Sequence, residues 1–168
     1  MKPSIKFLIL TGLSLGAVLG MAGTFVPSAN LRSIFWAIDG TGLIIATVLL
    51  ALHFFRAQND LLAAGFLIYA IGESIMHLGN ATTLEGGIPS FAAGTALWST
   101  GIMLVSAPRG LALWNRVVGV IASLLFAATA LQIFWGATLT PLSHPLPFFA
   151  YPFLVLNFIG WAVMTAKK

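Results

Sequence analysis

An acid and a histidine one helical turn apart close an otherwise apolar stretch of the sequence, residues 60–79. They belong to the segment GESIMH, in which Glu73 and His77 stand at positions i and i+4. Side chains with this spacing share one face of a helix, so a carboxylate and an imidazole could reach the same ligand. A second acid, Asp39, lies in another apolar stretch, whereas the remaining two acids fall in predicted connectors.

Two kinds of chemistry fit these side chains. A metal ion could bind to Glu73, His77, Asp39 and His144, since carboxylate and imidazole ligands suit zinc or a similar divalent ion. Alternatively, Asp39 and Glu73 could share a proton in a medium of low dielectric, which suits the binding of a small cation, an amine or a proton. A third interpretation is structural: the two acids form hydrogen bonds to neighbouring helices and fix their packing.

The composition indicates the medium in which these groups lie. Hydrophobic residues make up 59% of the 168 and charged residues 7%, whereas soluble domains carry about 25% charged residues. Such a chain cannot cover a water-exposed surface, so we predict an all-α integral membrane protein. The absence of cysteine excludes disulfides and thiolate metal sites. The net charge of +4 comes from basic residues that stand singly between apolar segments, so we expect no nucleic-acid partner.

Six apolar segments are long enough to cross about 30 Å of hydrocarbon as helices. Residues typical of turns and loops separate them. Because several connectors are short, we predict that residues 1–168 form one antiparallel up-down bundle of six transmembrane helices. The predicted spans are 6–26, 33–54, 60–79, 89–107, 114–136 and 147–166.

The basic residues predict the orientation of this bundle. With the N-terminus inside, Arg32 is the one basic residue that faces outward, and all others face the cytoplasm. Such an excess of positive charge predicts that both the N- and C-termini are cytoplasmic. We expect the multi-pass protein in the cytoplasmic membrane of a bacterial cell, with the lipid bilayer as its partner. The inner set is Lys2, Lys6, Arg56, Arg109, Arg116, Lys167 and Lys168.

The first span has two further features. It resembles a cleavable signal peptide, because Lys2 and Lys6 precede an apolar run; no clear A-x-A cleavage pattern follows, and we expect the helix to be retained. It also carries Gly12, Gly16 and Gly20 at four-residue spacing, which favours close packing against another helix. We expect the partner helix in the same chain. A homo- or hetero-oligomer formed through this glycine face is the alternative.

The tryptophans and one sequence triplet give local expectations. Trp98 lies deep in its predicted span, and we expect it inside the bundle. The triplet NAT at 80–82 matches a glycosylation acceptor, but its connector is short and we expect no glycan. The other tryptophans lie near predicted span ends, where indoles commonly sit at the level of the lipid headgroups. These are Trp36, Trp114, Trp135 and Trp161.

Counting residues from the predicted span ends places the two intramembrane acids at one level. Asp39 and Glu73 each lie six residues from the outer end of a helix, about 9 Å below the boundary. Thr95 falls at a similar depth and Gln132 slightly shallower, whereas His144 belongs to the outer loop before the last span. We therefore predict an outward-facing polar pocket. Its expected ligand-binding or proton-binding residues are Asp39, Glu73, His77, Gln132 and Thr95.

These expectations favour a small non-enzymatic membrane protein that binds or moves a small ligand, cation or proton through the pocket. One alternative is a metal-dependent intramembrane hydrolase that uses the same acids and histidines. Another is an accessory or structural subunit of a membrane complex, in which the cluster only stabilises the bundle. A serine protease is disfavoured, because no histidine falls in the fifth or sixth span to activate Ser99 in the fourth.

Overall fold

The computed structural model describes residues 1–79 and 83–167. The possible glycan acceptor at 80–82 and one residue of the inner basic set, Lys168, lie outside this description. Within it, the regular structure is helical and contains no strand. The elements are α1 (Pro3–Leu15), a π-helical turn (Gly16–Gly20), α2 (Met21–Phe25), α3 (Ala29–Arg56), α4 (Asp60–Gly79), α5 (Ile88–Ser106), α6 (Leu113–Phe134), a 3₁₀ turn (Phe148–Ala150) and α7 (Tyr151–Ala166).

In the described part of the chain, six helical segments are long and apolar enough to cross a membrane. α1, the π turn and α2 together form the first, Pro3–Phe25, and the 3₁₀ turn with α7 forms the last, Phe148–Ala166. The all-α class and the six predicted spans are therefore confirmed.

Local sequence explains where several helices begin. The Ser28 hydroxyl caps α3 by accepting a hydrogen bond from the N–H of Leu31 at 3.4 Å. The side-chain oxygen of Asn59 accepts from the N–H of Leu62 at 3.3 Å and caps α4 in the same way. Pro89 lies in the first turn of α5, where its missing N–H removes no intrahelical hydrogen bond.

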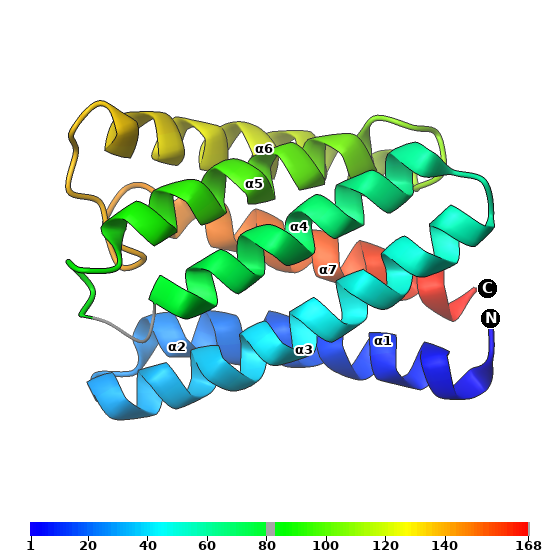
Figure 1. Ribbon diagram of the computed structural model, residues 1–168, viewed down its shortest axis with the longest axis horizontal. Coiled ribbons are helices and arrows are strands. Elements are labelled where there is room, and N and C mark those ends of the chain that lie inside the picture. Colours follow the sequence, from blue (N-terminus) through cyan, green and yellow to red (C-terminus); the bar gives the residue numbers. More distant parts are fainter. Residues whose placement is uncertain (80–82, 168) are drawn as a thin grey trace.

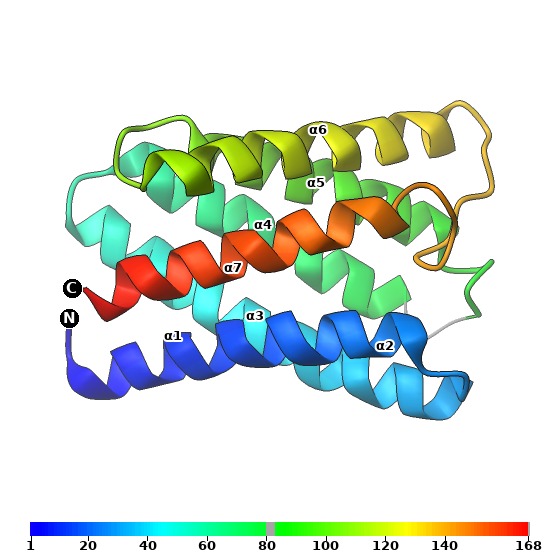
Figure 2. The same cartoon turned by 180° about the vertical axis from the view of Figure 1, so that it is seen from behind.

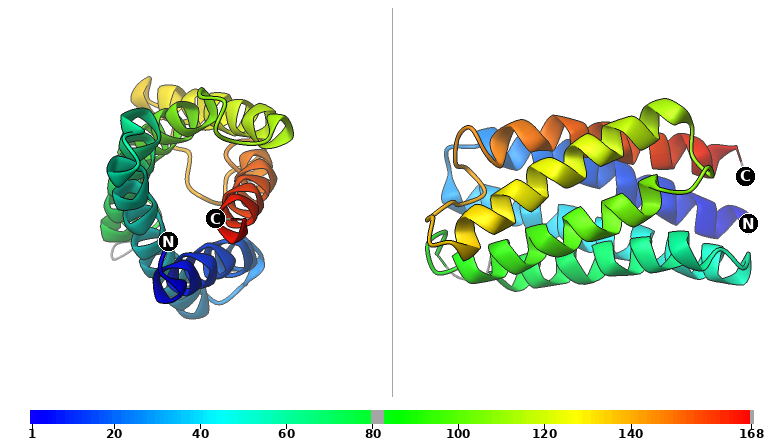
Figure 3. Two further views of the ribbon diagram at one scale, coloured as in Figure 1. Left: turned by 90° about the vertical axis from the view of Figure 1, so that its right-hand side faces the viewer. Right: turned by 90° about the horizontal axis from the view of Figure 1, so that it is seen from above.

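The helices lie lengthwise, side by side, and form a ring (Figures 1 and 2). α1 packs on α3, α3 on α4, α4 on α5 and α5 on α6, and α7 closes the ring by contacting both α6 and α1. Figure 3 shows this ring end on. Both chain ends lie at one end of the bundle, the terminal end (Figure 1), where the Lys6 ammonium donates to the Ala166 carbonyl at 2.6 Å. We call the opposite end the far end.

The glycines of the first segment pack against α3. Gly12 lies against the backbone of Gly42, and Gly16 lies against the Leu43 side chain. At Gly16–Gly20 the segment widens into a π turn, a local feature that is frequent at functional sites. The contacts agree with the expectation of a partner helix in the same chain. They also cover the glycine face that the alternative assigns to an oligomer.

An aromatic column fills the ring from near the terminal end to its centre. Its rings are buried and pair with centroid separations of 5.0–6.1 Å. Trp98 belongs to it, which confirms the interior position expected for this residue. Trp161 belongs to it too, so the expectation of a headgroup-level indole is wrong for Trp161. The column consists of Phe54, Phe66, Tyr69, Trp98, Phe158 and Trp161.

Candidate functional site

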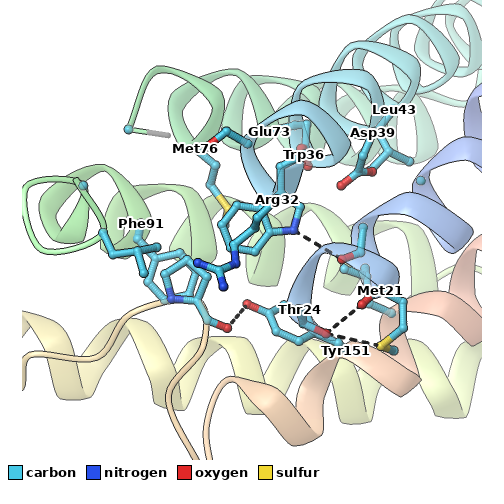
Figure 4. Close-up of a pocket in the computed structure, with 18 of the residues that line it drawn as sticks. Met21, Thr24, Arg32, Trp36, Asp39, Leu43, Glu73, Met76, Phe91 and Tyr151 are labelled. Carbon is cyan, nitrogen blue, oxygen red and sulfur yellow. Dashed lines mark hydrogen bonds between the residues drawn. The ribbon is translucent and has the colours of Figure 1, made fainter. Parts of the chain in front are cut away.

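A cavity of about 500 Å³ lies inside the far end of the ring (Figure 4). Its wall comes from the π turn, α2, the first half of α3, the second half of α4, α5 and α7 as far as their middle, and the connectors that precede α5 and α7. Ala29, Ser33 and Glu85 are exposed residues of this wall, so the cavity opens at the far end. Sites for small molecules have volumes of about 300–1,000 Å³. The cavity therefore has the size of a site for an organic ligand.

Three carboxyl groups line this cavity: that of Glu85 is exposed at the opening, and two buried ones come from α3 and α4. Asp39 is 8% exposed and Glu73 is 6% exposed. Within the described residues, Asp39 Oδ1 and Glu73 Oε2 have no hydrogen-bond partner. The two groups are close enough to interact electrostatically. Because a buried carboxyl group without a partner is unfavourable, a ligand that supplies a donor or a positive charge would be stabilised here.

Glycines make room for both carboxyl groups. The Asp39 carboxylate lies against Gly20 in the π turn, where a Cβ would stand 2.8 Å from Oδ2. The next residue of α3, Gly40, faces α4: a Cβ there would stand 3.1 Å from Glu73 Oε1 and 2.7 Å from His77 Nδ1. Consecutive positions of α3 thus contact two different helices. The acids consequently reach the cavity from adjacent parts of its wall.

Two buried donors lie beside the Glu73 carboxyl group. The rings of Trp98 and Tyr69 stack with their centroids 5.5 Å apart, and the indole nitrogen and the phenol oxygen both interact with Glu73. Neither atom has a partner with full hydrogen-bond geometry among the residues described. Glu73 therefore lies at the junction between the cavity and the aromatic column.

Arg32, Trp36 and Asp39 occupy positions i, i+4 and i+7 of α3 and line one wall of the cavity. Arg32 Nη2 donates to the Val26 carbonyl at 2.8 Å, while its Nε is buried and unpartnered in the described structure. The guanidinium carbon lies 6.0 Å from the centroid of the Trp36 ring. Trp36 Nε1 donates to the Gly20 carbonyl at 3.3 Å (Figure 4). A positive charge therefore stands closer to the far end than the acids do.

The aromatic column closes the cavity on the side of the terminal end. Leu43, Trp98 and Phe158 line the cavity where it meets the column. Behind them, Tyr69 contacts the rings of Phe158 and Trp161, with centroid distances of 6.1 and 5.6 Å. All these side chains are buried. The arrangement favours a blind pocket over a channel through the bundle.

His77 packs beside the cavity and is not part of its wall. Its ring lies against Gly40, as does the Glu73 carboxyl group, so the structure brings the i and i+4 residues of GESIMH together. No group of three or more histidine, aspartate or glutamate side chains that could hold a metal ion occurs within residues 1–79 and 83–167. Glu73, His77, Asp39 and His144, which the sequence proposes as zinc ligands, do not form such a group there.

Three other predicted site residues lie away from the cavity. Thr95 is fully buried, and its hydroxyl donates within α5 to the Phe91 carbonyl at 2.8 Å. Gln132 is exposed on α6, a helix that contributes no residue to the cavity wall. His144 is exposed, and its ring lies 4.1 Å from that of Phe148. The count along the helices predicts only a level for each residue, and a level does not determine which face of the helix the residue occupies.

Sequence reasoning missed several residues of the cavity wall. It used Arg32 only as an outer charge and Trp36 only as a span-end indole, although their spacing from Asp39 places all three on one helix face. Tyr151 also lines the cavity, and its hydroxyl donates to the Pro141 carbonyl at 2.9 Å. No sequence signal links Tyr151 to the acids, because the contact arises when α7 closes the ring.

No family model matches the sequence, and neither a curated protein nor a solved structure is found to be similar to it. The fold therefore defines a broad class of protein: multi-pass membrane proteins with six apolar helices in their described part. Within this class, the cavity and its two buried acids are the features from which a function can be argued.

Proposed function

We propose that the protein binds a small, positively charged ligand in the cavity at the far end of the bundle. The observation that carries this proposal is a pair of buried acids in the wall of a largely apolar cavity, Asp39 and Glu73, each with one carboxyl oxygen that has no hydrogen-bond partner among the described residues. Coulombic attraction between a cation and a carboxylate is far stronger in such a medium than in water. Acids inside membrane spans are therefore usually functional or paired.

The aromatic side chains of the wall support a cationic ligand. Trp36, Trp98 and Phe91 line the same cavity as the acids. A cation over an aromatic face gains about 0.5–2 kcal/mol, and tryptophan is the most favourable ring. An organic cation would use both features, because its charge can approach the carboxyl groups while its apolar part contacts the rings.

We assign the far end to the outer face of the cytoplasmic membrane. In this assignment the bundle is an antiparallel, up-down arrangement of six spans with both termini inside, and the ligand enters from outside. The distribution of basic residues supports it: Arg56 ends α3 at the terminal end, and Lys6 and Lys167 flank the chain ends there, whereas Arg32 lies at the far end.

Binding is favoured over passage through the bundle. The aromatic column stands between the cavity and the terminal end, and its rings are buried and in contact. A metal-dependent hydrolase would need three protein ligands around one ion, and no group of three or more histidine, aspartate or glutamate side chains that could hold an ion occurs within residues 1–79 and 83–167. An accessory subunit with a purely structural cluster would be expected to pair its buried acids.

Equilibrium binding to the purified protein tests the proposal. The probes are n-octylamine, a monocation at neutral pH, and n-octanol, a neutral molecule of similar shape that partitions into detergent as well. We expect the wild type to bind octylamine at least about tenfold more tightly than octanol, since a charged hydrogen bond contributes about 1.5–3 kcal/mol. The Asp39→Asn/Glu73→Gln double variant should lose this preference.

Asp60→Asn is the matched control, because Asp60 is an acid in the first turn of α4 at the terminal end, outside the cavity wall. This variant should keep the wild-type preference for octylamine over octanol. An equal affinity of the wild type for both probes, or an unchanged preference in the double variant, would contradict the proposed cation site.

A further inference from the structure

The cavity carries charges of both signs at two levels. Near the rim, Arg32 contributes a guanidinium group whose Nε is buried and has no partner among the described residues. Further in, Asp39 and Glu73 line the wall, and each has one buried carboxyl oxygen without a partner in the described part of the chain. No described residue pairs the guanidinium group with either acid, because Arg32 instead contacts the Val26 carbonyl and the Trp36 ring.

The separation of these levels follows from helix geometry. Arg32 and Asp39 are seven residues apart on one face of α3, which corresponds to about 10 Å along the helix axis. Glu73 belongs to the deeper level, because its Oε1 would stand 3.1 Å from a Cβ on Gly40, the neighbour of Asp39. The cavity thus has the Arg32 guanidinium group and the exposed Glu85 carboxyl group toward its opening, and two buried carboxyl groups toward its floor.

The buried Arg32 Nε and the size of the cavity argue against a bare inorganic cation as the ligand. Such an ion could interact with the acids but would offer no acceptor to the guanidinium group of Arg32. A water-sized particle also occupies only about 30 Å³, so it would leave most of the cavity of about 500 Å³ unfilled. The Arg32 Nε would remain buried without a partner, which is unfavourable for a charged donor.

We propose that the ligand is a zwitterionic organic molecule that spans both levels. Its ammonium group binds between Asp39 and Glu73, its anionic group binds Arg32, and its apolar body lies against the wall formed by Trp36 and Phe91. This inference rests on the proposed cation site and adds the anionic group and its distance from the cation. A carboxylate suits the guanidinium group of Arg32, since the two can form paired hydrogen bonds.

Binding measurements on the purified full chain in detergent test this inference. The probes are 8-aminooctanoate, n-octylamine and octanoate, which share one chain length and differ in their charged groups, and 4-aminobutanoate, which carries both charges on a shorter chain. We expect 8-aminooctanoate to bind at least about tenfold more tightly than each of the other three, because it alone can reach both levels.

One variant and a matched control test the contact between Arg32 and the anionic end of the ligand. Arg32→Gln should abolish the preference for 8-aminooctanoate over octylamine, because the carboxylate of the ligand loses its partner. Arg116→Gln is the matched control: Arg116 donates to the carbonyls of Ser106 and Ala107 at 3.0 and 2.9 Å, outside the cavity wall. It should leave the affinity for 8-aminooctanoate unchanged.

The possible failures are distinguishable. If octylamine binds the wild type as tightly as 8-aminooctanoate does, and Arg32→Gln changes neither affinity, the zwitterionic ligand is excluded and the cation site stands. If 4-aminobutanoate binds as tightly as 8-aminooctanoate, the two-level spacing is wrong. If neither octylamine nor 8-aminooctanoate binds, both the inference and the cation site on which it rests are overturned.

Discussion

The Asp39 carboxylate lies directly against Gly20, so that a Cβ at Gly20 would stand 2.8 Å from Asp39 Oδ2. Gly20 ends the π turn of the first segment, and its carbonyl accepts the hydrogen bond from Trp36 Nε1. The irregular turn of one helix and the acid of the next are thus in contact. Because Gly20 has no side chain, the carboxylate can remain at this position beside the cavity.

Gly20→Ala should therefore weaken ligand binding more than it affects stability. The added methyl group would meet only the end of a side chain, so Asp39 can turn away with little change in the bundle. We expect octylamine affinity to fall about fivefold or more, which corresponds to about 1 kcal/mol, while the unfolding temperature stays close to that of the wild type. Titration and thermal unfolding of the same preparation measure both quantities.

Gly12→Ala provides the contrast. Its added methyl group would meet the carbonyl oxygen of Gly42, a backbone atom that cannot turn away. We expect this variant to lose about 1–3 kcal/mol of stability, a typical cost of overpacking, and the folded fraction to bind octylamine as the wild type does. The same loss of binding in both glycine variants would show that Gly20 acts through general packing.

The buried carboxyl oxygens that have no partner among the described residues should lower the stability of the ligand-free protein. Glu73→Gln replaces a buried carboxyl group by a neutral amide of similar shape, so we expect the unfolding temperature to rise or stay constant. A cluster whose role is only structural predicts the opposite, a loss of more than about 1 kcal/mol. Thermal unfolding in detergent without added amine distinguishes the two.

Ser123→Ala is the reference for a polar group that does stabilise the bundle. The Ser123 hydroxyl is buried and donates to the Ser99 carbonyl at 2.8 Å, joining α6 to α5. Its removal should cost about 1 kcal/mol. If Glu73→Gln lowers stability as much as Ser123→Ala does, the carboxyl group has a partner in the bundle and the proposed site loses its main support.

The spans could be predicted from the sequence because the hydrocarbon thickness imposes a minimum length of apolar helix. α4 has the predicted bounds, since Asn59 caps its start and Gly79 ends its apolar run. α3 begins four residues before its predicted start, because the cap at Ser28 lies beyond the apolar run from which the span was counted. Caps and apolar length together thus determine where α3 and α4 begin.

The site could be predicted only where depth alone places a residue. Counting residues from the span ends predicts the same depth in the membrane for Asp39 and Glu73, and both line the cavity. The same count predicts nearly this depth for Gln132, but Gln132 is exposed on α6. The order of the helices in the ring determines which helix faces contact one another. That order depends on α7 closing the ring against α1. No local pattern in the sequence contains this information.

A second polar cluster, near the terminal end, offers a test of packing outside the cavity. A Cβ at Gly119 of α6 would collide with the Ser106 hydroxyl of α5 and stand 2.9 Å from Asn157 Oδ1 of α7. We expect Gly119→Ala to lose about 1–3 kcal/mol. Ser106→Ala alone should be nearly neutral, because its hydroxyl has no partner among the described residues, and in the double variant it should restore part of the loss. A double variant no more stable than Gly119→Ala would place the strain elsewhere.

The proposed orientation can be tested with single cysteines, because the chain contains none of its own. Asn30, Glu85 and Thr138 are exposed at the far end, and Ala57 and Ala112 are exposed at the terminal end. In intact cells, a membrane-impermeant maleimide should label cysteines at the first three positions and reach the other two only after the cells are opened. The reverse pattern would place the cavity on the cytoplasmic face, where the excess of basic residues at the terminal end would contradict the usual distribution of charge. Labelling at both ends in intact cells would show that the preparation leaks, which a cytoplasmic marker protein with a reactive cysteine detects in the same experiment.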